Sequence, residues 1–144
     1  MYKHILIATD GSQLAEKAIS AGLALAKGVG AKATAVTVSE PWASARTCHG
    51  SVVVPFDAYE NAAAEAASKS LASVSKLAKQ LDVECRTVHI KEQTAEGILQ
   101  VANSRGCDLI VMASHGRRGF SRLFLGSHAI RVLTESPVPV LICK

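Results

Sequence analysis

The order of apolar runs and amphipathic segments limits what this chain can fold into more than any other feature of its sequence. Five short apolar runs, at residues 4–9, 32–38, 83–90, 108–113 and 138–143, are typical of β-strands. A segment with helical spacing separates each run from the next. Strands joined through helices pair in parallel, and the helices then cover both faces of the sheet. The pattern predicts an α/β protein with an open, parallel, five-stranded sheet of the Rossmann-like type.

Capping residues mark the starts of the predicted helices. Ser12 is expected to cap the first helix, which stops at the glycines near residue 30. Asp57 and Glu60 form a capping-box pattern at the start of a long helix that runs to about residue 81. Thr94 is expected to cap the next helix, and the last helix is predicted over 126–135.

The whole chain, residues 1–144, is expected to form one domain. If the first strand is central, the second lies on one side of it and the fourth on the other, which gives the strand order 3-2-1-4-5. The chain is 49% hydrophobic but only 4% aromatic, so its core must consist of small aliphatic side chains. The 39–56 stretch is predicted to be irregular, and long loops of this kind are often functional lids.

Composition and charge argue against several classes of protein. No apolar run approaches the ~20 residues of a membrane helix, and the first strand begins too early to leave room for a signal peptide. We therefore expect a cytoplasmic protein. The four cysteines form no CxxC pair; three are expected to be buried thiols in or beside strands, and Cys48, in a loop, is expected to be inert. The net charge of +4 is mild, and the basic residues gather between Arg117 and Arg131, which argues against a nucleic-acid partner.

A glycine-rich basic loop, residues 113–127, follows the fourth strand and leads into the last helix. Glycines let a backbone approach an anion, and the N–H groups at a helix start point toward it. Arg117, Arg118 and Arg122 add positive charge to the loop. Asp10 ends the first strand, and in the predicted order the first and fourth strands end side by side. The sequence therefore predicts a site for a phosphorylated small molecule between these two strand ends.

Each of these residues also has a purely structural interpretation. Asp10 with Gly11 and Ser12 makes a favourable turn from strand to helix. In this interpretation, the only role of Gly116 and Gly119 is to allow a positive φ. His115 is expected to hydrogen-bond within the loop rather than to catalyse, because no triad surrounds it. The ligand site is favoured because Asp10 and the glycine-rich loop are predicted to lie at the same place, and not by any single residue.

Beyond these patterns, the chain resembles the universal stress protein family over essentially its full length. The opening KHILIATDGS (3–12) is similar to the family's first strand and acidic turn, and SPVPVLI (136–142) to its last strand. The loop resembles the signature of the ATP-binding members, which is a glycine, two residues, a glycine, nine residues and Gly-Ser. Gly116 takes the second glycine position, and Gly126 and Ser127 take the final pair. Ala113 stands where the first glycine is expected.

This resemblance implies a site for ATP or another adenine nucleotide, with Mg²⁺ left open. Asp10, with Ala8, Thr9 and Val38, would surround the adenine and ribose. Met112 and Ala113 would line the ribose side, and the methyl group of Ala113 is expected to weaken binding without abolishing it. The residues expected at the phosphates are Gly116, Gly126, Ser127 and the His128 backbone, with Arg117 and Gly119 in the same loop.

Several functions remain open for such a site. The leading interpretation is a nucleotide-binding stress-response or signalling module. One alternative is an ATP-using enzyme, but the chain has no Walker lysine and no evident general base, so at most slow hydrolysis is expected. Another is a dimeric scaffold that binds no nucleotide. A phosphoacceptor receiver domain is set aside, because the third strand does not end in an aspartate.

The fifth strand is expected to be a sheet edge that needs a cover. Its residues Val138, Val140, Leu141 and Ile142 are apolar on both faces, and such an edge promotes association. The family resemblance implies a homodimer in which two fifth strands pair antiparallel. Pro137 and Pro139 lack N–H donors, which should confine that pairing to residues 140–143.

Overall fold

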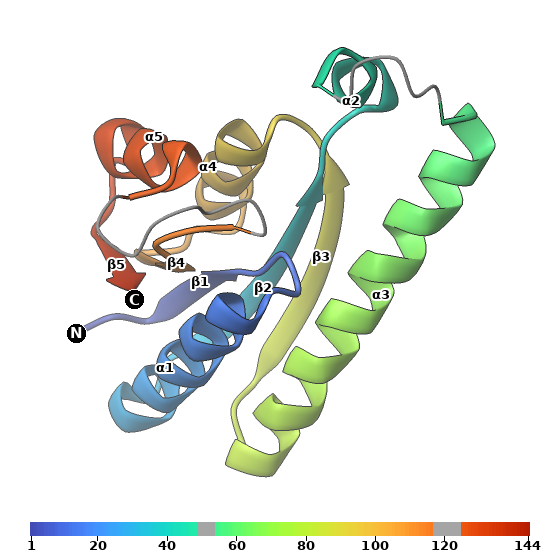
Figure 1. The fold of residues 1–144 in the computed structure, drawn as a ribbon. Coiled ribbons are helices and arrows are strands. Elements are labelled where there is room, and N and C mark those ends of the chain that lie inside the picture. Colours follow the sequence, from blue (N-terminus) through green and yellow to red (C-terminus); the bar gives the residue numbers. More distant parts are fainter. Residues whose placement is uncertain (49–53, 117–124) are drawn as a thin grey trace.

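A five-stranded parallel sheet forms the centre of the molecule (Figure 1). The computed structural model describes residues 1–48, 54–116 and 125–144. The strands are β1 (His4–Ala8), β2 (Lys32–Ser39), β3 (Cys85–Lys91), β4 (Leu109–Ala113) and β5 (Val140–Cys143), in the order β3-β2-β1-β4-β5. Every neighbouring pair is parallel. The predicted fold class and strand order are confirmed, and the carboxyl ends of β1 and β4 lie side by side.

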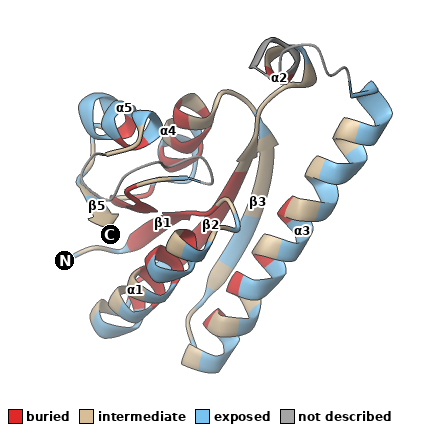
Figure 2. Cartoon of the chain, in the orientation of Figure 1, coloured by how far each residue is buried: buried red, intermediate tan, exposed pale blue. Residues whose placement is uncertain are grey.

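Helices cover both faces of this sheet (Figure 1). One face carries α1 (Gln13–Val29) and α3 (Phe56–Leu81), and the other carries α4 (Thr94–Ser104) and α5 (Ser127–Glu135). Buried residues accordingly form two clusters, one on each side of the sheet. Figure 2 shows the burial concentrated in the central strands and in the inward sides of the helices.

Small residues let the helices approach the sheet closely. A Cβ atom added at Gly22 of α1 would lie 2.8 Å from two side-chain carbons of Ile7. At Gly97 of α4 it would lie 2.8 Å from Cγ1 of Val38. Glycine is therefore the residue that fits at both contacts. The second contact also places α4 directly against a residue predicted to line the ligand site.

Two of the predicted helix caps are wrong and one is confirmed. Ser12 is the N-cap of α1, and its side chain accepts the backbone N–H of Ala15. The N-cap of α3 is Pro55 rather than Asp57: its carbonyl accepts the Tyr59 N–H, and Asp57 lies in the first turn, where a carboxylate is favourable. Gln93 is the N-cap of α4, and Thr94 instead donates from its hydroxyl to Glu40.

The 39–56 stretch is not irregular throughout, because it contains α2 (Trp42–Cys48). The carbonyl of Pro41 accepts the backbone N–H groups of Ser44 and Ala45 and so begins that helix. Trp42 also donates its indole N–H to the carbonyl of Val54 at 2.8 Å. Its ring meets that of Phe56 edge to face, with 5.7 Å between centroids.

Two strands begin two residues later than predicted, and β4 begins one residue later, at Leu109. β5 begins at Val140 because Pro137 and Pro139 have no N–H to donate, although the Pro139 carbonyl still accepts from Ile110. β3 begins at Cys85 because α3 ends with Asp82 in the left-handed region, at a φ of 57°. Residues 83 and 84 are needed for the chain to turn back toward the sheet, so the strand cannot begin before Cys85.

Membrane-spanning helices and clusters of metal ligands are both absent from the described part of the chain. None of its helices is long and apolar enough to cross a bilayer. No three metal-ligating side chains gather anywhere in residues 1–48, 54–116 and 125–144. Cys85, Cys107 and Cys143 are free thiols, and burial raises the pKa of Cys107 to about 11.

Candidate functional site

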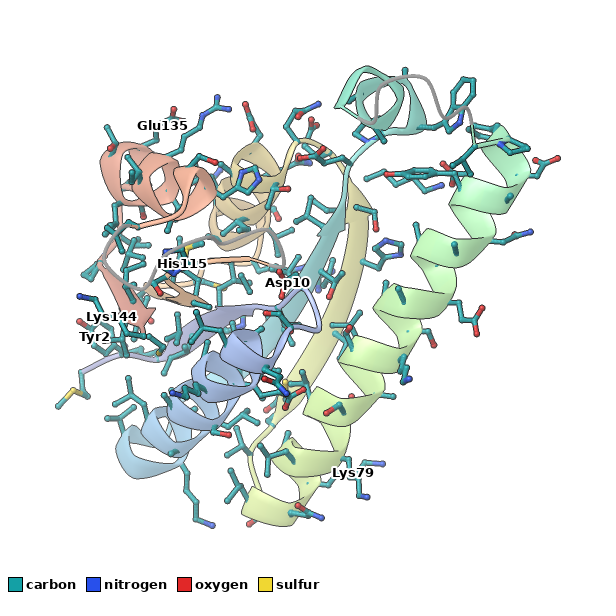
Figure 3. The ribbon with its side chains drawn as sticks, in the orientation of Figure 1. Tyr2, Asp10, Lys79, His115, Glu135 and Lys144 are labelled. Carbon is teal, nitrogen blue, oxygen red and sulfur yellow. The ribbon has the colours of Figure 1, made fainter. Side chains whose placement is uncertain are left out.

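The carboxyl end of β1 forms a tight, hydrogen-bonded turn that positions Asp10 (Figure 3). The backbone N–H of Thr9 continues the ladder to Val36, and the Thr37 hydroxyl donates to the Thr9 carbonyl at 3.0 Å. Gly11 has a φ of 78°, which glycine adopts readily. Oδ1 of Asp10 accepts the backbone N–H of Ser12 at 2.9 Å. Asp10 therefore has the structural role expected of a turn residue, and that role fixes its carboxylate at the strand end.

The loop after β4 returns to this carboxylate. A Cβ atom at Gly116 would lie 3.0 Å from Oδ2 of Asp10, so the two predicted parts of the site meet. The described residues with a positive φ are Gly11, Gly30, Asp82 and Gly106. Gly116 is not among them. Glycine is therefore favoured at this position by the lack of space for a side chain and not by the backbone conformation.

Gly126 fixes the start of α5 against the end of β4. It is the N-cap, its N–H donates to the Ser114 carbonyl at 2.7 Å, and a Cβ atom there would lie 3.1 Å from the same oxygen. Gly126 has no side chain that could cap the first N–H groups of α5. Ser127 and His128, the first two helical residues, are exposed. This helix start can therefore present backbone donors to an anion.

The remaining predicted residues lie around these two strand ends. Val38 is half-buried beneath α4, and Ala8 and Met112 are buried in the cluster on the α4 and α5 side. The Ala113 side chain belongs to the opposite cluster, on the α1 side. Arg117 and Gly119 lie outside the described residues, as do Arg118 and Arg122.

His115 makes the loop hydrogen bond that the sequence suggested. Its Nδ1 lies 2.9 Å from Oγ of Ser114, and the Ser114 N–H donates to the Cys143 carbonyl. Within the described structure its buried Nε2 has no hydrogen-bond partner. In Figure 3 the His115 side chain lies on the β5 side of the sheet, apart from Asp10.

Sequence reasoning missed Glu40, which follows β2 as Asp10 follows β1. Oε1 of Glu40 accepts from the Thr94 hydroxyl at 3.3 Å and lies 3.9 Å from Nε2 of His128. The Tyr59 hydroxyl donates to the Glu40 backbone carbonyl at 2.6 Å. Attention to every polar residue at a strand's carboxyl end would have found it.

A hollow of about 430 Å³ lies at the opposite end of the sheet. Lys3, Lys27 and Lys32 line it together with Asp82 and Glu84. Lys27 donates to the Leu81 carbonyl, at the end of α3, so a cation meets the negative end of a helix there. We assign the hollow no part in the site, because the strand-end residues described above lie at the other edge.

The sequence matches the Universal stress protein family over residues 1–144. The chain belongs to this family. A universal stress protein of Thermus aquaticus is 34% identical over 149 residues, with 100% of both chains covered. The Bacillus subtilis universal stress protein YxiE is 31% identical over 148 residues, also with 100% of both covered.

Solved structures of family members show the same fold. The hypothetical protein MJ0577 of Methanocaldococcus jannaschii superposes with a TM-score of 0.84 at 25% identity, covering 100% of this chain and 96% of that one. A universal stress protein in complex with cAMP has a TM-score of 0.69 at 19% identity, with 98% and 95% covered. One from Archaeoglobus fulgidus in complex with dAMP has a TM-score of 0.68 at 19% identity, with 99% and 98% covered.

Proposed function

We propose that this universal stress protein binds an adenine nucleotide between the ends of β1 and β4 and acts as a cytoplasmic stress-response or signalling module. The observation that carries the proposal is the contact between Gly116 and Asp10, where a Cβ atom would come within 3.0 Å of Oδ2. Both halves of the predicted site converge there. Two structural relatives were solved with adenine mononucleotides, which supports the same ligand class.

The described residues fit such a ligand. Asp10 would accept hydrogen bonds from ribose hydroxyls, and Val38 and Met112 would give apolar contacts to the base and sugar. The closely packed backbone at Gly116 and Gly126, with the first N–H groups of α5, would hold phosphate oxygens. The loop arginines at 117, 118 and 122 would add attraction for anions of any kind.

Replacement of Gly126 by valine tests this site. The new side chain would crowd the Ser114 carbonyl and the approach to α5, so we expect at least tenfold weaker binding of AMP, ADP or ATP by calorimetry. Gly28→Val is the control, because no atom lies within 4 Å of a Cβ there. Wild-type protein that gives no binding heat and releases no nucleotide on mass analysis would contradict the proposal. Titrations with and without Mg²⁺ decide whether the ion accompanies the nucleotide.

We also propose that the protein forms a homodimer through β5. This strand is an edge of the sheet, and its Leu141 side chain is 40% exposed. Val140 and Ile142 face the other side of the sheet, and Val138 packs there just before the strand. An apolar edge with unpaired backbone groups favours pairing with a second copy.

A further inference from the structure

Glu40 contacts one residue from the first turn of each of three helices. Thr94 is the first residue of α4, His128 is the second residue of α5, and Tyr59 lies in the first turn of α3. Their contacts with Glu40 are the hydrogen bonds of 3.3 Å and 2.6 Å and the 3.9 Å approach described above. The carboxylate itself contacts α4 and α5, whose positive ends favour a negative charge, whereas the contact with α3 is made by the backbone carbonyl. The Glu40 side chain is 30% exposed, so it is held in place without being sealed from solvent.

This carboxylate lies beside the part of α5 that would bind phosphate. His128 contacts Glu40 through its side chain, and its backbone N–H is one of the donors assigned to the nucleotide. The His128 side chain and the 3.9 Å approach at its tip are therefore what separate the Glu40 carboxylate from this backbone donor. An anion bound at the start of α5 would be repelled by the carboxylate.

Among the described residues, no lysine or arginine forms an ion pair with Glu40. Glu96, on the same side of the sheet, is paired with Arg131, which also contacts Glu135 at 3.0 Å. The ion-pair partner of Glu40 is His128, which is charged only when protonated. The loop arginines lie outside the described residues.

We propose that Glu40 is a specificity-determining residue that disfavours each additional phosphate and biases the site toward nucleoside monophosphates. The inference rests on the nucleotide site proposed above. ATP carries more negative charge than ADP, and ADP more than AMP, so repulsion from a fixed carboxylate grows along the series. Because salt screens such interactions over about 8 Å at physiological ionic strength, the effect is a graded preference and not exclusion.

Glu40→Gln tests the proposal, because glutamine keeps an acceptor for the Thr94 hydroxyl and removes only the charge. Calorimetry with AMP, ADP and ATP at low salt should show a gain in affinity that grows with the number of phosphates. We expect the ratio of ATP affinity to AMP affinity to rise about two- to fivefold. The rise should shrink in 0.5 M salt, because the screening length falls there to about 4 Å.

Glu84→Gln is the matched control, because it makes the same change in net charge at the opposite end of the sheet. It should leave the affinity ratio unchanged. An equal gain for all three nucleotides in Glu40→Gln, or the same gain in Glu84→Gln, would overturn the role of Glu40. Failure of the wild-type protein to bind any of the three would instead overturn the proposed nucleotide site.

Discussion

His4 shows how a single buried residue can make stability depend on pH. It lies at the start of β1, and its Nε2 lies 2.8 Å from Oγ1 of the buried Thr34. Desolvation by burial, followed by the nearby positive charge of Lys32, lowers the pKa of His4 from its ordinary value of 6.5. Asp108 opposes this shift and Arg105 acts in both directions, through its backbone and its charge. The folded protein therefore keeps His4 neutral to a lower pH than the unfolded chain does.

The free energy of unfolding should consequently fall as the pH drops below about 6.5. In that range the unfolded chain binds a proton that the folded protein does not. Urea denaturation at pH 7.5 and pH 5.5 should show that the free energy of unfolding decreases more in the wild type than in His4→Gln. The control His89→Gln, at a less buried histidine on β3, should show the same decrease as the wild type. An identical pH dependence in wild type and His4→Gln would show that another group is responsible.

Side chains at the site could be predicted only in part from the sequence. Asp10 and Gly116 were found because strand ends and glycines are visible in a sequence, and the strand order then brings them together. Ala113 was expected to crowd the ribose, yet its side chain lies in the cluster on the α1 side of the sheet. Glu40 was missed because its partners, Thr94 and His128, come from distant segments that only the fold brings together.

At the scale of elements, the depth at which α1 and α4 pack on the sheet depends on glycine. Gly97 lies in α4 against Val38 and Ile90, whereas Gly28 lies in α1 with open space around it. Alanine favours a helix over glycine by about 1 kcal/mol. Substitution at these two positions therefore distinguishes the effect of helix propensity on stability from the effect of packing.

We expect Gly97→Ala to destabilise the protein and Gly28→Ala to stabilise it. At Gly97 the new methyl group would lie 2.8 Å and 2.9 Å from the two γ carbons of Val38, whose branched side chain adapts poorly. Overpacking of this kind costs about 1–3 kcal/mol, enough to cancel or exceed the helix gain. At Gly28 a gain of ~0.5–1 kcal/mol is expected. Chemical denaturation measures both, and equal stabilisation by the two changes would contradict the packing argument.

Element types were more predictable than element boundaries. Apolar periodicity identified every strand of the sheet, and the Ser12 cap was correct. The starts of α3 and α4 were misplaced because several polar residues near each start could have capped it. The helix α2 was missed because its short sequence has no clear apolar stripe, and it is held by Trp42, Val54 and Phe56 instead.

For the whole molecule, the order of the strands determines both the site and the exposed edge. The alternation of strands and helices was enough to predict that order, since crossover connections limit the topologies available. Among the described residues, the same order leaves β5 unpaired on one side. The backbone contact from Ser114 to Cys143 links the end of this strand to the glycine loop.

Replacing Leu141 by lysine should dissociate the proposed dimer. A positive charge at the strand edge opposes pairing with a second copy, and the 40% exposure of Leu141 lets the monomer accept it. Light scattering at micromolar concentration should report a dimer for the wild type and a monomer for Leu141→Lys. Val54→Lys, at a similarly exposed residue near the start of α3, should remain dimeric. A monomeric wild-type protein would refute the dimer.

The packing of Trp42 gives the molecule an optical reporter of its own. Trp42 is the sole tryptophan of the chain, and it follows Glu40 by two residues. Its indole N–H is bonded to the Val54 carbonyl, and its ring lies against Phe56, so both the polarity around it and its contacts depend on how α2 meets α3. The fluorescence of Trp42 therefore reports on a single, known place in the fold. Unlabelled protein can reveal by its emission whether events at the end of β2 reach the neighbouring helices.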